Sequence, residues 1–268
     1  MFESVSIIGG DLRQITVAHV LQDHGYQVSV FGLDKEISID HLTPVKKAEQ
    51  AFQKQIIVLP VPVSFDGSTV NAPFSSTPIK METMLEQINP AALVFGGRFS
   101  DSLIHSLETK GIAYRDYMKR EELAIKNAVP TAEGAIEIAM SETPITLHLS
   151  RCLVLGYGRI GKILSKMLAG IGAKVTVEAR KFADLALIEG HGYEAIHMND
   201  LKENIGGFDV IFNTIPSMVL DEDTLKKIRK DTLVIDLASK PGGVDFEAAK
   251  QLGIRVIWAL SLPGKVIC

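Results

Sequence analysis

The chain has 268 residues, enough for two domains with their own cores, and a formal net charge of -4. This acidic balance argues against nucleic-acid binding, which usually needs a basic patch, and no apolar run is long enough to cross a bilayer. The first residues, MFESVSIIGGD, lack the basic start and long apolar core of a secretory signal. Only two cysteines occur, and the histidines show no HxxH or HExxH spacing. We therefore expect a cytoplasmic protein without a disulfide framework or a bound metal.

Short apolar runs alternate with amphipathic stretches, a pattern typical of parallel sheets with helices on both faces. In the first half of the chain, the predicted strands are Val5–Ile8, Val28–Phe31, Ile56–Leu59 and Leu93–Phe95. The predicted helices of this half are Gln14–Asp23, Lys80–Gln87 and Asp101–Thr109.

The stretch IIGGDLRQ, residues 7–14, follows the first predicted strand and begins a helix. Aligned on GxGxxG, it places Asp11 and Gln14 where the second and third glycines belong. The Asp11 carboxylate would oppose a pyrophosphate where the backbone must approach it, so we expect no dinucleotide here. We expect Asp11, Arg13 and the loop around Arg98 to face the substrate instead. The alternative for Asp11 is a helix N-cap, a position that Asp often occupies.

A bridging helix is predicted over residues 130–140, PTAEGAIEIAM, with Pro130 and Thr131 at its start and a break at Thr143–Pro144. We therefore expect a substrate-side domain over 1–125, a bridging helix and linker over 126–145, and a cofactor domain over 146–268. The expected fold class is α/β, with two Rossmann-like, doubly wound parallel-sheet domains. The cleft between such domains is the usual ligand site.

The second half of the chain repeats the alternation. Its predicted strands are Leu153–Leu155, Val175–Val177, Val210–Phe212, Leu233–Ile235 and Arg255–Trp258. Its predicted helices are Lys162–Leu168, Thr224–Arg229 and Phe246–Gln251.

A GxGxxG fingerprint lies between the first strand and the first helix of this half. The first glycine permits a tight turn, the second lets a pyrophosphate approach the backbone, and the third lets helix and strand pack closely. The helix N-terminus offers free N–H groups to the phosphates. The sequence therefore predicts a dinucleotide site whose residues are Gly156, Gly158, Arg159, Ile160 and Gly161.

The end of the next strand decides between NAD and NADP. An NAD site places an acid there for the ribose 2′-hydroxyl, but Glu178 lies about one residue early, and alternation would point it away from the ribose. Ala179 takes the expected place, followed by Arg180 and Lys181. Arg180 can stack on the adenine and bind a 2′-phosphate, with Lys181 as a second charge. We therefore expect NADP rather than NAD; the alternative is that both cations are merely solvated.

Two later strand ends complete the expected pocket, because strand C-termini face the ligand crevice of an open parallel sheet. The first supplies further cofactor contacts at Asn213, Thr214, Ile215 and Pro216. The second supplies Ser239 and Lys240 for the substrate. Turn-forming chemistry is the alternative for both segments.

The segments GGDLRQ, NAVPTAEGAIEIAM, GYGRIGK, NTIPSM and DLASKPGGVDF occur in this order, and with them the chain resembles the family of the A-type subunit of dipicolinate synthase from about residue 5 to 266. The resemblance implies NADP-linked oxidation of a dihydrodipicolinate-type ring to dipicolinate during sporulation, in the mother-cell cytosol. It also implies a partner, the flavoprotein-like B-type subunit. The family continues past LPGxVAP with a Thr-Ala-Gly segment and a closing helix, whereas this chain ends at SLPGKVIC. The usual C-terminal segment is therefore expected to be missing.

Oxidising such a diacid needs cations for two carboxylates and a group that takes a proton. The family's helix-opening arginine and its basic residue before PGG are present as Arg13 and Lys240, and we expect these to bind the carboxylates. Further substrate-binding candidates are Arg98, Arg120, Thr131 and Ser239. The catalytic candidates are Asp11, Glu133 and Lys240, although an acid at Glu133 would also suit the first turn of the predicted helix.

Two other functions remain open. A 2-hydroxy-acid dehydrogenase has a similar plan but uses a histidine on a late loop, and none follows His197. A non-catalytic NADP-binding protein that regulates the B-type subunit fits the lack of a clear acid–base pair. A homo-oligomer is also compatible with the sequence.

Overall fold

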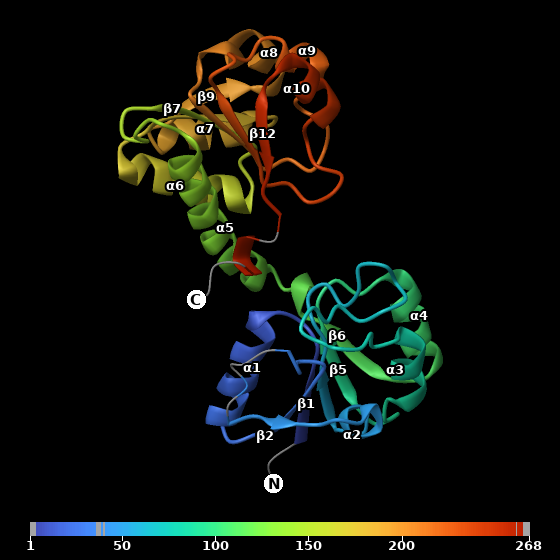
Figure 1. The fold of residues 1–268 in the computed structure, drawn as a ribbon. Coiled ribbons are helices and arrows are strands. Elements are labelled where there is room, and N and C mark those ends of the chain that lie inside the picture. The colour runs from blue at the N-terminus through green and yellow to red at the C-terminus, as the bar shows by residue number, and fades with distance from the viewer. Residues whose placement is uncertain (1–3, 36–38, 40, 261, 265–268) are drawn as a thin grey trace. The chain divides into compact units, whose positions relative to one another are not determined.

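The computed structural model describes residues 4–35, 39, 41–260 and 262–264. The chain forms two compact units, unit 1 up to Ala124 and unit 2 from Ile125 onward (Figure 1). None of the helices described is both long enough and apolar enough to span a membrane.

Unit 1 is a six-stranded parallel sheet with the strand order β3-β2-β1-β4-β5-β6. Its strands are β1 (Ser4–Ile8), β2 (Gln27–Phe31), β3 (Thr43–Pro44), β4 (Ile56–Val58), β5 (Leu93–Gly96) and β6 (Ala113–Asp116). Its helices are α1 (Leu12–Asp23), α2 (Ala48–Phe52), α3 (Met81–Gln87), α4 (Asp101–Thr109) and the 3-10 turn η1 (Tyr117–Lys119). The order reverses between β1 and β4, which places the ligand crevice of this fold at their carboxyl ends.

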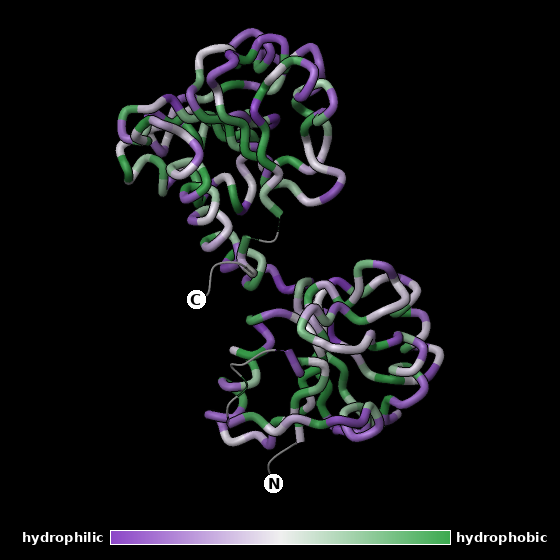
Figure 2. The backbone as a smooth tube through the Cα atoms, in the orientation of Figure 1, coloured by the Kyte–Doolittle hydropathy of each residue, from purple (hydrophilic) through white to green (hydrophobic). Residues whose placement is uncertain are grey.

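Helices cover both faces of the unit 1 sheet, because neighbouring strand residues point to opposite sides. Ile7 packs in one buried cluster with Ile15 of α1. Its neighbour Ile8 packs in the other, with Met84 of α3. Both strand residues are fully buried. The hydropathy view shows the same concentration of apolar residues along the strands (Figure 2).

Unit 2 has the strand order β12-β11-β10-β7-β8-β9, again all parallel. Its strands are β7 (Arg151–Leu155), β8 (Lys174–Ala179), β9 (Glu194–His197), β10 (Val210–Asn213), β11 (Leu233–Asp236) and β12 (Arg255–Trp258). The helices that follow the first strand are α6 (Arg159–Ile171), α7 (Phe182–Gly190), α8 (Leu201–Asn204), α9 (Glu222–Leu225) and α10 (Phe246–Leu252). Three short 3-10 turns are η2 (Met198–Asp200), η3 (Ile205–Gly207) and η4 (Leu262–Gly264).

The order of this sheet reverses between β7 and β10, so its ligand crevice lies where those two strands end. Val154 packs with Leu164 of α6 on one face. Leu155 packs with Ala248 of α10 on the other. The predicted fold class, two Rossmann-like doubly wound parallel sheets, is confirmed.

The predicted start of the bridging helix is wrong. Helix α5 runs from Glu121 to Glu142 and holds Pro130 in its interior. Proline has no N–H and cannot bond the carbonyl of residue 126, yet the helix continues through it. Thr131, one residue later, donates its hydroxyl to the Asn127 carbonyl at 2.7 Å. Glu133 therefore lies in the second half of the helix, and the suggested role in a first turn is also wrong.

All nine predicted strands are present, with ends that differ by at most two residues. The helix predicted over 224–229 ends early, at Leu225. The sequence prediction missed β3, β6 and β9 and the helices α2, α7 and α8. The expectation about the chain end concerns residues after Gly264, which lie outside the described part of the chain.

Candidate functional site

The turn after β7 needs glycine at two of its three fingerprint positions. Gly156 has a φ of +91°, and a Cβ there would lie 2.8 Å from both Thr214 Oγ1 and Ile215 Cγ1. A Cβ at Gly161 would lie 2.0 Å from the Gly156 carbonyl oxygen. These contacts bring the start of α6 directly against the end of β7, as the first and third glycines of the fingerprint should.

Gly158 differs, because a Cβ there would meet nothing within 4 Å. It is the N-cap of α6, with extended backbone angles, and it is exposed. Its carbonyl accepts the Lys162 N–H at 3.0 Å. The first-turn N–H groups of a 13-residue helix thus border open space, which fits the approach of an anionic pyrophosphate. Arg159 is exposed and Ile160 half-buried at this helix start.

Glu178 clamps the glycine turn from the neighbouring strand. Its carboxylate Oε2 accepts the Gly156 N–H at 3.1 Å, and that N–H is shared with the Glu178 carbonyl at 3.1 Å. Only 1% of the residue is exposed, and its Oε1 has no hydrogen-bond partner among the described residues. Burial raises the pKa of this carboxyl above its ordinary value, opposed by the Gly156 bond and by nearby His197 and Arg180. The sequence predicts that Glu178 points away from the ribose, but not that it binds the glycine turn.

The two cations after β8 are exposed. Arg180 and Lys181 form no ion pair with any carboxylate in the described ranges, and Ala179 before them is buried. The Arg180 carbonyl lies 3.1 Å from Nε2 of His197, which ends β9. The His197 ring stacks on Phe182, with ring centroids 5.1 Å apart and planes 15° apart. Neither aromatic residue was among the predicted site residues.

Asn213 and Asp236 form a buried pair at the ends of β10 and β11. The Asn213 amide donates to Asp236 Oδ1 at 2.8 Å and to the Ile215 carbonyl at 3.1 Å, and its own oxygen accepts the Ile215 N–H. Both side chains are fully buried. Thr214 donates its hydroxyl to the Leu155 carbonyl at 2.8 Å, while Pro216 is exposed. This segment is held beside the glycine turn by its own polar groups.

The loop after β11 presents the predicted substrate residues of unit 2. Asp236 accepts the Ala238 N–H at 3.0 Å and the Gly243 N–H at 3.0 Å, which fixes both ends of the loop. Ser239 and Lys240 lie at its exposed tip. A structural carboxylate thus holds a basic side chain at the end of a central strand. Asp236 lies at the strand end expected to face the ligand, and its side chain instead binds the backbone of this loop.

In unit 1, Asp11 and Arg13 bind each other. Asp11 caps α1 by accepting the Arg13 backbone N–H at 3.1 Å, so the N-cap interpretation is confirmed. The Arg13 guanidinium also donates to both Asp11 oxygens, at 2.9 Å and 2.7 Å. It donates further to the Val61 carbonyl at 3.2 Å, after β4. The hydrogen bond to Asp11 raises the pKa of Arg13, although burial opposes the change.

Arg98 lies in the left-handed region, with a φ of +59°, on the loop after β5. Asp116, at the end of β6, accepts the N–H groups of Arg98 and Phe99, both at 3.2 Å. A non-glycine residue in this region is uncommon and is held here by these bonds. The Arg98 side chain is exposed at the carboxyl edge of the sheet.

The remaining candidates lie at or on α5. Arg120 precedes the helix, is 66% exposed, and pairs with Glu122. Thr131 is buried, with its hydroxyl bonded within the helix, and Glu133 is exposed. The described residues contain no group of three or more side chains able to hold a metal ion.

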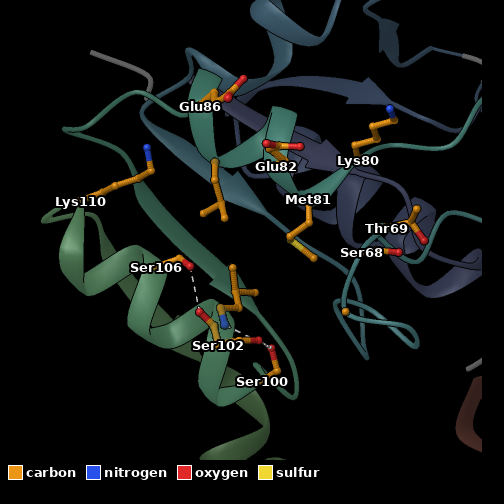
Figure 3. Close-up of a pocket in the computed structure, with 13 residues that line it drawn as sticks. Ser68, Thr69, Lys80, Met81, Glu82, Glu86, Ser100, Ser102, Ser106 and Lys110 are labelled. Carbon is orange, nitrogen blue, oxygen red and sulfur yellow. Dashed lines mark hydrogen bonds between the residues drawn. The ribbon is translucent and has the colours of Figure 1, made fainter.

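A separate hollow of about 640 Å³ lies on unit 1 between α3, α4 and the loop around Ser68 (Figure 3). Its polar rim carries both signs of charge, from Lys80, Lys110, Glu82 and Glu86. Of the loop around Arg98 that was expected to face the substrate, only Ser100 lines this hollow among the described residues, and Arg98 itself does not. The mixed charge favours no single class of ionic ligand.

Comparison with known proteins gives two family matches. Residues 4–118 match the family of the N-terminal domain of the dipicolinate synthase A-type subunit. Residues 137–258 match the shikimate/quinate 5-dehydrogenase family. A dehydrogenase-type Rossmann domain of this kind implies a nicotinamide cofactor.

Whole-chain comparisons agree. The chain is 35% identical to the A-type subunit of dipicolinate synthase from Bacillus subtilis over 98% of its own length and 89% of that protein. It superposes on the crystal structure of the corresponding protein from Bacillus halodurans with a TM-score of 0.91 and 33% identity, covering 98% of this chain and 91% of that one. A transhydrogenase from Sinorhizobium meliloti, 15% identical with a TM-score of 0.70, covers 97% of this chain and 88% of that one and shares the fold. The chain belongs to the family of the A-type subunit of dipicolinate synthase.

Proposed function

We propose that the chain is an NADP-dependent oxidoreductase subunit that oxidises a dihydrodipicolinate-type ring to dipicolinate. One observation carries the choice of cofactor. The acid of β8, Glu178, is 1% exposed and bonded to Gly156, so a ribose hydroxyl cannot reach it. Arg180 and Lys181 are exposed two and three residues later. An accessible pair of cations beside an inaccessible acid suits a 2′-phosphate better than a 2′-hydroxyl.

The residues of the glycine turn fit the cofactor. Gly156, Gly158 and Gly161 would hold its pyrophosphate at the start of α6, with Thr214 and Ile215 packed against the turn. The nicotinamide would accept a hydride from a ring carbon, while a second ring hydrogen leaves as a proton, so that NADP⁺ and the dihydropyridine become NADPH and dipicolinate. Aromatisation of the ring favours this direction, and correct positioning supplies much of the catalysis.

The diacid needs cations, and each unit offers one at a strand end. In unit 2 this is Lys240, on the loop that Asp236 fixes. In unit 1 it is Arg13, whose Nη1 donates no hydrogen bond to the described residues and is left for a carboxylate. Arg98, Arg120, Thr131 and Ser239 remain further substrate-binding candidates.

A side chain that takes the proton has less support than the cations that bind the carboxylates. Asp11 accepts four hydrogen-bond contacts from Arg13, which occupy the lone pairs that a base would use. Glu133 is exposed on α5 and stays a candidate. A dihydropyridine proton can also pass to water, so the reaction does not require a protein base.

The family relationship supports the remaining parts of the proposal. They are a partnership with the flavoprotein-like B-type subunit, a role in sporulation in the mother-cell cytosol, and a division into a substrate-side domain over 1–125, a bridge over 126–145 and a cofactor domain over 146–268.

The test is NADPH formation from dihydrodipicolinate by the purified chain, with and without the B-type subunit. We expect NADPH and dipicolinate to appear in equal amounts. Gly158→Asp, which opposes the pyrophosphate with a carboxylate, should lower kcat/KM by about 100-fold or more. Gly170→Asp, at the other end of α6 with open space around it, is the matched control and should change kcat/KM less than about twofold.

A second candidate is a non-catalytic NADP-binding protein that regulates the B-type subunit. The mutual pairing of Asp11 and Arg13 favours it, because it leaves no evident acid–base pair among the described candidates. Turnover that needs the B-type subunit, and that is insensitive to Gly158→Asp, would establish this alternative and rule out hydride transfer in this chain.

A further inference from the structure

We propose that Phe182 and His197 form the adenosine-binding platform of unit 2, with Phe182 stacking on the base and His197 positioning the cations that bind the 2′-phosphate. The inference rests on the proposed function, since it assigns residues to the adenosine end of the same cofactor site.

Phe182 is an exposed aromatic residue without a role in the core. It is the first residue of α7, and 79% of it is exposed, although most large apolar residues of this unit are buried. Its ring lies almost parallel to the His197 imidazole, 5.1 Å away and tilted by 15°. An aromatic ring fixed from one side in this way offers a flat surface on which a purine base can stack.

His197 is fixed by hydrogen bonds on both ring nitrogens. Its Nδ1 accepts the Asn199 N–H at 3.2 Å, which makes Nε2 the protonated nitrogen. Nε2 therefore donates to the Arg180 carbonyl at 3.1 Å. His197 is the last residue of β9 and pairs with Ala179 in the sheet. Its side chain therefore connects β9 to the turn that follows β8.

The aromatic ring of Phe182 and the two cations, Arg180 and Lys181, lie in the same short turn after β8. Arg180, Lys181 and Phe182 are consecutive, all three are exposed, and the clamped Glu178 lies just before them. A 2′-phosphoadenosine group carries a flat base and a dianion on the same ribose. A ring for the base and two cations for the phosphate match that pair of features. Because His197 holds the Arg180 backbone, it acts on the phosphate through Arg180 and is a positioning residue.

These roles predict different effects on two ligands. Loss of the Phe182 ring removes stacking on the base, which every adenosine ligand shares. Loss of His197 lets the Arg180 turn move and should weaken chiefly ligands that carry the 2′-phosphate. The ratio of the affinities for ligands with and without the 2′-phosphate therefore distinguishes the two roles. A general loss of structure would weaken both kinds of ligand and leave that ratio unchanged.

The experiment is isothermal titration of the full chain with 2′,5′-ADP and with 5′-AMP, neither of which has a nicotinamide. Phe182→Ala should weaken both ligands by a similar factor of roughly 5 to 50, and Phe182→Tyr should restore both. Leu187→Ala, an exposed apolar residue of the same helix, is the control and should leave both affinities unchanged.

His197→Ala should weaken 2′,5′-ADP by roughly tenfold and 5′-AMP by less than about twofold. His197→Gln keeps an N–H donor for the Arg180 carbonyl and should recover most of the affinity for 2′,5′-ADP. Circular dichroism melting of each variant confirms that it is folded.

The platform is overturned if Phe182→Ala binds both ligands as tightly as the wild type, or if the wild type binds neither. The positioning role is overturned if His197→Ala leaves the ratio of affinities unchanged. A wild-type chain that binds 5′-AMP as tightly as 2′,5′-ADP would instead refute the NADP proposal. A loss of both affinities in Phe182→Ala would still support the stacking role in that case.

Discussion

The three fingerprint glycines are needed for different physical reasons. Gly161 is required by packing, because a Cβ there would overlap the Gly156 carbonyl at 2.0 Å. Gly158 has open space around it and backbone angles that any residue can adopt. Glycine at position 158 is therefore required by the approach of the ligand and not by the fold.

Two alanine substitutions separate these reasons. We expect Gly161→Ala to lower the free energy of unfolding by about 1–3 kcal/mol, the usual effect of overpacking. Gly158→Ala should leave stability within about 0.5 kcal/mol of the wild type and still weaken NADPH binding. Urea unfolding and calorimetric titration measure the two effects. Equal loss of stability in both variants would contradict this division of roles.

Glu178 should make stability depend on pH in a definite direction. Its pKa is raised in the folded chain above the ordinary value of 4.5, so the folded state binds its proton more tightly than the unfolded state does. Stability linked to this group is complete below pH 4.5 and is lost as pH rises through the folded pKa.

Glu178→Gln removes that titration while keeping an oxygen for the Gly156 N–H. The difference in the free energy of unfolding, variant minus wild type, should therefore become more positive between acidic and neutral pH. Urea unfolding at a series of pH values measures it. A difference that is constant with pH, or that falls as pH rises, would show that Glu178 does not carry a raised pKa.

Single residues also mark the limit of prediction from sequence. The glycine pattern and the exposed Arg180 and Lys181 follow from spacing, because strand and helix periods place them. The bond of Glu178 to Gly156 depends on a neighbour 22 residues away, and the pairing of Asp11 with Arg13 depends on the side-chain rotamers of both residues. Strand alternation predicts that Glu178 points away from the ribose, but it does not identify the group that Glu178 binds, nor the ion pair between Asp11 and Arg13.

Strands could be predicted from the sequence where burial on both faces requires apolar residues. The central strands β4, β7, β10 and β11 consist mostly of buried apolar residues, and β1 is interrupted by the buried Ser6, since both faces of these strands are covered. The missed strands β3, β6 and β9 lie at sheet edges, and the burial pattern of β6 alternates between exposed and half-buried. An edge strand with polar residues resembles a loop in sequence.

Helix α5 shows how tertiary packing overrides a local signal. Pro130 predicts a helix start, but the buried residues Ala128, Thr131, Ala132 and Ala135 continue across it with helical spacing. Packing of that apolar face compensates for the missing backbone hydrogen bond.

Replacing this proline should stabilise the protein. Pro130→Ala restores the N–H inside α5, and we expect the free energy of unfolding to rise by about 1–3 kcal/mol. Urea unfolding checks this, with Val129→Ala as the exposed neighbouring control, expected to stay within about 0.5 kcal/mol. A fall in stability on Pro130→Ala would mean that the ring makes packing contacts worth more than the hydrogen bond.

For the whole molecule, two sheets of the same strand order differ in the turn at their switch points. Unit 2 has a glycine turn open to an anion at Gly158, whereas unit 1 has the Asp11 carboxylate at the matching place. The same fold therefore occurs twice in the chain, but only the turn of unit 2 is open to a pyrophosphate, which argues against a second dinucleotide site in unit 1.

The most direct test of this account is the affinity of the full chain for NADPH and NADH, measured by calorimetry on the wild type and on Arg180→Ala. The wild type should bind NADPH at least about tenfold more tightly, and Arg180→Ala should lose that preference through weaker NADPH binding alone. A wild type that prefers NADH, or an Arg180→Ala variant with unchanged NADPH affinity, would contradict it.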